Sequence, residues 1–130
     1  MRRRRRLLIL CTGNSARSQM AEGLFRHLRG EEWEVHSAGS APTGRVRPEA
    51  VQALREMGLD ISSHRSKHVD EFADGLFDVV LTVCDHAAEA CPVYPAETRR
   101  IHWPLPDPQT YADFLAVRDE LLNRIKSHWD

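Results

Sequence analysis

Along the chain, segments whose hydrophobic residues have the spacing of strands alternate with segments whose hydrophobic residues have the spacing of helices. Four segments have the short apolar or alternating runs of strands, at residues 5–11, 33–37, 77–83 and 99–103. Helical spacing marks residues 17–29, 48–57 and 110–127, with room for one or two further turns at 85–90. The unbroken apolar run from Leu7 to Leu10 is typical of a strand buried on both faces. Alternating strands and helices predict an α/β fold, with a parallel sheet, helices on both faces and right-handed crossovers.

Length, charge and cysteine content narrow the class of protein. The chain has 130 residues, which suits one domain spanning residues 1–130. A net charge of −1 with interspersed signs indicates neither nucleic acid nor membrane as a partner. Arg2 to Arg6 precede an apolar run of four residues, too short for the ~7–15 of a signal peptide or the ~20 of a membrane span. Three cysteines are too few for a disulfide framework and indicate a reducing compartment, the cytoplasm.

The segment from Cys11 to Arg17 connects the first predicted strand to the first predicted helix. Backbone N–H groups in such a loop of small residues converge above a helix N-terminus and attract anions. Arg17 adds a planar guanidinium that matches a tetrahedral oxyanion. The same positive field favours the thiolate of Cys11, a nucleophile aimed at the central atom of a bound oxyanion. The alternative is that Cys11 is a small buried core residue at a strand end.

This stretch resembles the phosphate loop and first helix of thioredoxin-coupled arsenate reductases, which share the fold of low-molecular-weight protein tyrosine phosphatases: Cys11-Thr12-Gly13-Asn14-Ser15-Ala16-Arg17-Ser18-Gln19-Met20-Ala21-Glu22-Gly23. The resemblance implies a three-layer domain whose four-stranded parallel sheet has the order 2-1-3-4. It also implies a loop that binds the oxyanion through Thr12, Gly13, Asn14, Ser15, Ala16, Arg17 and Ser18. Asn14 would hold the loop in shape, and Ser18 would stabilise the thiolate of Cys11.

Two later segments extend the resemblance: Val83 to Pro92, with Cys84 and Cys91, and Ile101 to Trp103 followed by Asp107-Pro108. In the implied reaction Cys11 attacks arsenate and Asp107 protonates the departing oxygen. Cys84 then attacks Cys11 and releases arsenite, after which Cys91 attacks Cys84. Thioredoxin reduces the resulting Cys84–Cys91 disulfide, so the enzyme needs electrons from thioredoxin and no bound cofactor. Phosphate or sulfate would compete with arsenate for the loop.

Two positions depart from the family pattern. Ala16 stands where many members carry a further cysteine, which takes no part in the relay. Some members bind potassium through an Asn, a Glu, a Ser and an Asp. Asn14, Glu22 and Ser37 match the first three, whereas Lys67 stands at the fourth. An ammonium repels a cation and can take its place, so we expect no metal site and no potassium dependence.

A phosphatase is the main alternative. It would hydrolyse phosphate monoesters through a Cys11 phosphoenzyme, with Arg17 binding the phosphate and Asp107 as the general acid. In phosphatases of this family tyrosines usually follow the Asp-Pro pair directly, whereas Gln109 and Thr110 follow it here. This difference argues against an aryl phosphate as the main substrate.

A metal or arsenite sensor is a second alternative, built on Cys84 and Cys91 with histidines such as His86 and His102. The gap of six residues between the cysteines is a poor match to zinc-site spacings. Most of the histidines suit surface or loop positions, with His64 and His102 as candidate neighbours of the site. No long apolar patch favours a stable dimer, so we expect a monomer.

Overall fold

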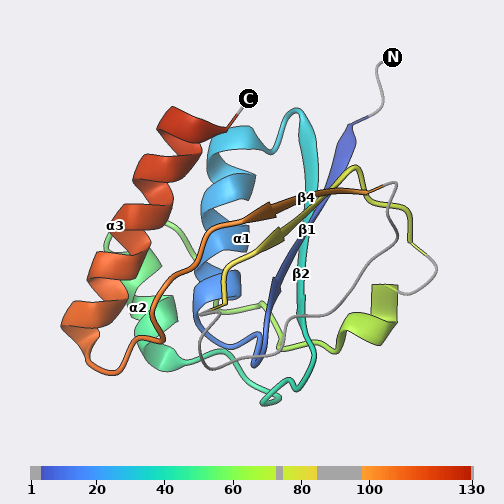
Figure 1. Ribbon diagram of the computed structural model, residues 1–130. Helices are drawn as coiled ribbons and strands as arrows, with labels where there is room; N and C mark the ends of the chain where they lie inside the picture. The colour runs from blue at the N-terminus through green and yellow to red at the C-terminus, as the bar shows by residue number, and fades with distance from the viewer. Residues whose placement is uncertain (1–3, 73–74, 85–97, 130) are drawn as a thin grey trace.

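The computed structural model describes residues 4–72, 75–84 and 98–129 (Figure 1). Its elements in chain order are β1 Arg5–Cys11, α1 Arg17–Arg29, β2 Trp33–Gly39, α2 Pro48–Arg55, the 3₁₀ helix η1 Val69–Phe72, β3 Val79–Thr82, β4 Arg99–His102 and α3 Tyr111–His128. The four predicted strands and three long helices are all present, and their ends differ from the predicted ones by two residues or fewer. The turns predicted at 85–90 lie outside the described residues.

The four strands form one parallel sheet in the order β2-β1-β3-β4, as predicted. β1 lies inside the sheet, where Leu10 pairs with Ala38 of β2 on one side and with Thr82 of β3 on the other. The chain leaves β1 for β2 and later returns to β3 on the opposite side. The order therefore reverses between β1 and β3, and the crevice beyond their carboxyl ends is where such sheets bind ligands.

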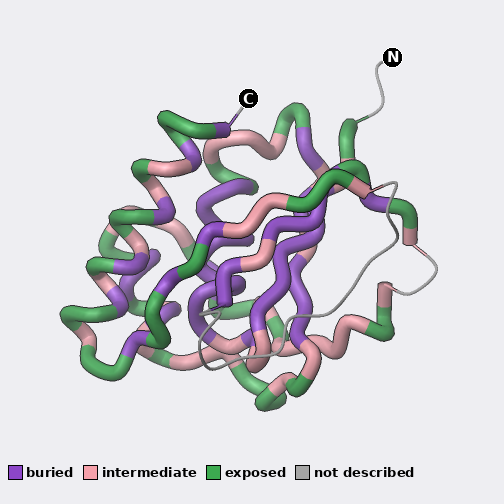
Figure 2. Tube along the Cα trace, in the orientation of Figure 1, coloured by how far each residue is buried: buried purple, intermediate pink, exposed green. Residues whose placement is uncertain are grey.

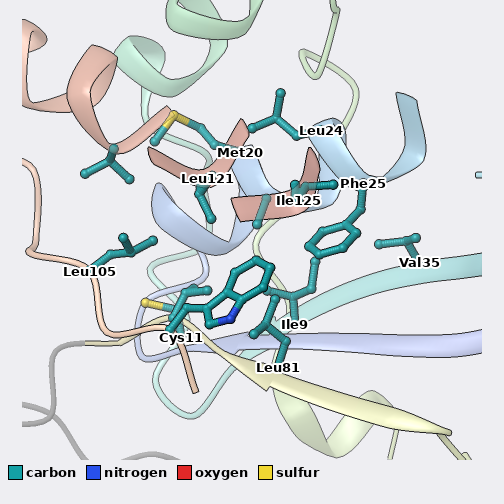
Figure 3. Close-up of a cluster of buried hydrophobic side chains, with 14 of the residues drawn as sticks. Ile9, Cys11, Met20, Leu24, Phe25, Val35, Leu81, Leu105, Leu121 and Ile125 are labelled. Atoms are coloured by element: carbon teal, nitrogen blue, oxygen red, sulfur yellow. The ribbon is translucent and has the colours of Figure 1, made fainter. Parts of the chain in front are cut away.

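The two faces of the sheet are covered differently. Leu7, Ile9 and Cys11 of β1 belong to a large core cluster that contains residues of all three α-helices (Figure 3). Leu8 and Leu10 point to a smaller cluster with residues of η1, and Figure 2 shows the central strands buried between the two. Helices were predicted on both faces. In the described residues the three α-helices share one face, and the other face carries only the 3₁₀ helix η1.

Local sequence signals explain where the helices begin and end. Pro48 occupies the first turn of α2, where its missing N–H is not needed. The Thr110 side chain accepts from Asp113 N and the Asp113 side chain accepts from Thr110 N, which caps α3. Gly30 caps the end of α1 with a right-handed φ of −65°. A Cβ on Gly30 would lie 2.3 Å from Arg26 O, so close backbone contact, and not a left-handed turn, requires glycine.

Within the described ranges, no helix is long and apolar enough to span a membrane.

Candidate active site

Residues 12–16 form a loop at the carboxyl edge of the sheet, between β1 and α1 (Figure 1). Cys11 is the last residue of β1, and its thiol is buried. It pairs with Gly39 at the end of β2. A Cβ on Gly39 would lie 2.3 Å from Thr12 O and 2.7 Å from Cys11 O. Only glycine therefore lets β2 approach the loop this closely.

The carbonyl groups of the loop have partners outside it. Thr12 O, Gly13 O and Ser15 O accept hydrogen bonds of 2.8–3.1 Å from backbone N–H groups of residues 41–47. Ser66 Oγ also donates to Gly13 O at 3.0 Å. In a planar trans peptide the N–H points away from the C=O. The N–H groups that follow these carbonyls therefore point the opposite way, which is the arrangement that binds an anion.

Asn14 connects the loop to three other segments. It is buried and has φ +46°, in the left-handed region that side-chain-bearing residues rarely adopt. Its Nδ2 donates to Ser18 Oγ at 2.8 Å and to Ser37 Oγ at 3.0 Å. Its Oδ1 accepts from Lys67 N at 2.8 Å and from Gln19 Nε2 at 3.0 Å. These four bonds hold the unusual backbone conformation in place.

A buried carboxylate, that of Glu22, lies next to this network. Ser37 Oγ donates to Glu22 Oε1 at 2.5 Å, and Lys67 Nζ lies 3.8 Å from the same oxygen. Arg26 NH2 lies 2.9 Å from Glu22 Oε2, and His64 Nε2 lies 3.9 Å from it. Burial lowers the pKa of Lys67 and of His64, and the charge of Glu22 opposes both shifts. The residues that match the family's potassium ligands thus lie together, with the Lys67 ammonium among them.

Arg17 joins the loop to the segment between β4 and α3. Its guanidinium is 5% exposed, and NH1 donates to Leu105 O at 3.0 Å. NH2 lies 3.7 Å from Asp107 Oδ1, and Gln109 Nε2 donates to the other oxygen, Oδ2, at 3.2 Å. The Asp107 side chain is 59% exposed. The structure therefore places Asp107, the predicted general acid, at the rim of the loop. It lies beside Arg17, the residue predicted to bind the oxyanion.

Cys84 lies close to the end of β1. Val83 N donates to Leu10 O at 3.0 Å, so the pairing between the two strands continues to the residue before each cysteine. Cys84 is fully buried in the same core cluster as Cys11. Cys84 is disulfide-bonded, and Cys11 is not. Cys91, the third predicted relay residue, lies outside the described residues.

Sequence reasoning missed several residues of this site. Gln19 is buried and its amide contacts Asn14 and Arg65 O. Hydrophobic spacing does not single it out, and its place within the stretch from Cys11 to Gly23 that carries the resemblance is the signal that could have identified it. Ser66, which donates to the loop, lies in an irregular stretch that carries no such signal. His64 lies near the loop as predicted, through a contact of its Nδ1 with Gln19 Oε1 at 3.2 Å.

The sensor alternative depends on His86 and Cys91, which lie outside the described residues, and on His102. His102 Nδ1 is hydrogen-bonded to Thr82 Oγ1 on the neighbouring strand. Within residues 4–72, 75–84 and 98–129, no group of three or more His, Cys, Asp or Glu side chains could hold a metal ion.

The fold and the loop define the class of protein. The profile of the low molecular weight phosphotyrosine protein phosphatase family matches residues 6–129, and the chain belongs to this family. Relatives within the family include arsenate reductases. Arsenate reductase 2 of Staphylococcus saprophyticus is 44% identical over 126 residues, a match that covers 95% of each chain.

Solved structures agree with this placement. The structure of an arsenate reductase in its phosphate-binding state matches with a TM-score of 0.81 and 30% identity over 94% of each chain. A thioredoxin-dependent arsenate reductase of Corynebacterium glutamicum matches with a TM-score of 0.78 and 29% identity. That match covers 97% of this chain and 60% of the other.

Proposed function

We propose that this protein reduces arsenate to arsenite with electrons from thioredoxin. The observation that favours this most is the position of Cys84, buried beside the strand that ends in Cys11. A phosphatase needs only the first cysteine, because water completes its reaction. A reductase needs another thiol to take up the oxidation. The similarity to arsenate reductases, one of them thioredoxin-dependent, supports the proposal.

In the first step arsenate binds to the loop amides and to the guanidinium of Arg17. The thiolate of Cys11 attacks arsenic, and a sulfur–arsenic bond forms as one arsenic–oxygen bond breaks. Asp107 gives its proton to the departing oxygen, which leaves as water. The 3.7 Å between Arg17 NH2 and Asp107 Oδ1 supports this role.

In the second step the Cys84 thiolate attacks the sulfur of Cys11. The electron pair of the sulfur–arsenic bond passes to arsenic, which leaves as arsenite, and a Cys11–Cys84 disulfide forms. Cys91 then attacks Cys84 and restores the Cys11 thiolate. Thioredoxin reduces the Cys84–Cys91 disulfide and becomes oxidised itself.

Hydrolysis of phosphate monoesters is the second candidate, and the family of the chain favours it as a side activity. It would use the same loop, Cys11 and Asp107. Tyr111 is the first aromatic residue after the Asp-Pro pair, and its hydroxyl is bonded to Glu56 at the end of α2. A tyrosine ring held by this bond is not available to pack against the ring of an aryl phosphate. This supports arsenate as the main substrate.

The test is NADPH consumption with thioredoxin, thioredoxin reductase and arsenate, run beside hydrolysis of an aryl phosphate. Cys84→Ser and Cys91→Ser should each stop arsenate turnover and leave phosphate hydrolysis unchanged. Hydrolysis that is fast and indifferent to both cysteines, with no response to arsenate, would identify a phosphatase. Peptide mapping after a single turnover tests the order of the relay: we expect Cys84–Cys91, and a Cys11–Cys91 disulfide would contradict it.

A further inference from the structure

Gln109 is bonded to the carboxyl group that we propose as the acid. Its Nε2 donates to Asp107 Oδ2 and to Asp107 O, both at 3.2 Å. A carboxylate oxygen and a backbone carbonyl oxygen are acceptors only, so the nitrogen end of the amide must face them. The amide thus holds the carboxyl group from one side.

The other carboxyl oxygen has a different neighbour. Asp107 Oδ1 lies 3.7 Å from NH2 of Arg17, the residue that closes the anion loop. Arg17 is itself held by its bond to Leu105 O, in the same segment as Asp107. Oδ2 therefore accepts a hydrogen bond from Gln109, whereas Oδ1, at 3.7 Å, lies beyond hydrogen-bond distance of Arg17 NH2 and faces the anion site that Arg17 closes.

These neighbours decide which oxygen of Asp107 carries the proton. A carboxylic acid has one O–H, and its unprotonated oxygen is the better acceptor. With Gln109 donating to Oδ2, the proton occupies Oδ1. We propose that Gln109 is a positioning residue for the first chemical step, which it serves by keeping the Asp107 proton on the oxygen that faces the bound oxyanion. The inference rests on the proposed role of Asp107 as the general acid.

The backbone of this turn is held separately from the amide. Asp113 Oδ2 accepts from Gln109 N and from Thr110 N, both at 3.0 Å. Asp113 N donates in turn to Thr110 Oγ1 at 3.1 Å. A change of the Gln109 side chain therefore leaves the bonds of the turn intact. Thr110→Ala is the matched control, because it weakens the turn and leaves the Gln109 amide in place.

The test compares two substrates of the full-length protein that differ in their need for an acid. The leaving group of an aryl phosphate with an acidic phenol departs as the phenolate without a proton. The leaving group of phenyl phosphate is more basic and needs a proton from the acid. Gln109→Ala should lower kcat for phenyl phosphate about tenfold and change its KM, and kcat for the activated ester, by less than about twofold. Gln109→Met has a similar size but neither a charge nor an N–H donor, and it should behave like Gln109→Ala. In an Asp107→Asn background neither change should alter the rate further.

A merely structural role predicts a different result. Thr110→Ala acts through the backbone and should lower the rates on both esters equally. The same equal loss with Gln109→Ala, or no loss at all, would overturn the positioning role. So would a loss with Gln109→Ala that Gln109→Met restores, because the donor would then not matter.

Arsenate turnover with thioredoxin, measured on the same variants, separates this inference from the proposed function. A leaving-group effect without arsenate turnover would refute the reductase and leave the role of Gln109 standing. If neither ester is hydrolysed, kcat for arsenate decides: the double variant should equal Asp107→Asn, and an additive loss would contradict the role. Turnover of neither the esters nor arsenate would overturn both proposals.

Discussion

Among single residues, Asn14 combines an unusual backbone conformation with the hydrogen bonds that hold the loop. In the described part of the chain it is the one non-glycine residue with a positive φ. Its buried amide also makes hydrogen bonds to Ser18, Ser37, Gln19 and Lys67 N. Backbone conformation and side-chain bonding can be separated by substitution, because glycine adopts positive φ freely and alanine does not.

Asn14→Ala and Asn14→Gly should therefore differ. Both lose the four hydrogen bonds, but only alanine strains the loop, by about 1–2 kcal/mol. We expect Asn14→Ala to unfold at a lower urea concentration than Asn14→Gly and to bind phosphate more weakly in calorimetric titration. Identical behaviour of the two variants would mean that the positive φ does not matter for anion binding.

We expect Lys67 to determine the response to potassium. Its ammonium lies 3.8 Å from Glu22 Oε1, so a positive charge already stands beside this buried carboxylate. Exchanging sodium for potassium is expected to change neither the rate of arsenate turnover nor the melting temperature. Lys67→Asp removes that charge and adds a cation ligand, and this variant should gain stability from potassium. A clear rise in the melting temperature of the unmodified protein with potassium would contradict the expectation.

At the scale of elements, the approach of β2 to the loop depends on the absence of a side chain. Gly39→Ala places a carbon within 2.3 Å of Thr12 O, a backbone atom that cannot move without disturbing the loop. Such overpacking costs about 1–3 kcal/mol, and we expect it to weaken phosphate binding as well. Gly58→Ala is the control. An alanine at φ +80° is strained by about 1–2 kcal/mol, but its Cβ meets no atom within 4 Å. Gly58→Ala should therefore lower stability in urea unfolding and leave the affinity for phosphate unchanged.

The pairing of β1 with β2 also has an electrostatic component. The pKa of Glu34 falls from 4.5 to about 2, first through its hydrogen bond with His36 and then through that with Arg6. A lowered folded-state pKa stabilises the fold above pH 4.5, and this contribution is lost as the pH falls toward 2. Glu34→Gln should therefore reduce stability at pH 7 more than at pH 3 in urea unfolding. Glu31→Gln is the control, and an equal loss at both pH values would refute the assignment.

At the scale of the whole molecule, an aromatic cluster joins the last helix to the sheet. Trp129 follows α3 and lies 4.8 Å from Phe25 and 5.2 Å from Trp33 between ring centroids. Trp103, after β4, lies 6.0 Å from the same ring. The cluster connects α1, α3 and two strands at the same place, so its loss should affect the stability of the entire fold.

Trp129→Ala is expected to lower the free energy of unfolding by about 3–5 kcal/mol, because it leaves a cavity among packed rings. Leu76→Ala is the control, since Leu76 is 83% exposed and its truncation should change stability by less than about 0.5 kcal/mol. Chemical unfolding followed by circular dichroism measures both. Similar losses in the two variants would show that the aromatic cluster contributes little.

The elements of the fold follow from local patterns. Hydrophobic spacing placed β1 and α1 at the residues where the structure has them, because strand and helix periods are properties of neighbouring residues. The same local reading predicted Cys11 and Arg17 at the two ends of a strand-to-helix loop, which is where the structure has them. The sheet order was implied by resemblance, and it brought Asp107 to the edge where the structure places it.

By itself, then, the sequence determined which segments are strands and helices and which loop is the candidate for the chemistry. Tertiary structure alone decided which polar side chains meet. Asn14 bonds to Lys67 N across 53 positions of sequence, and Arg17 bonds to Leu105 O across 88. It also decided that the three α-helices share one face of the sheet. Such contacts depend on how distant segments pack against one another, and no local pattern of residues records that packing.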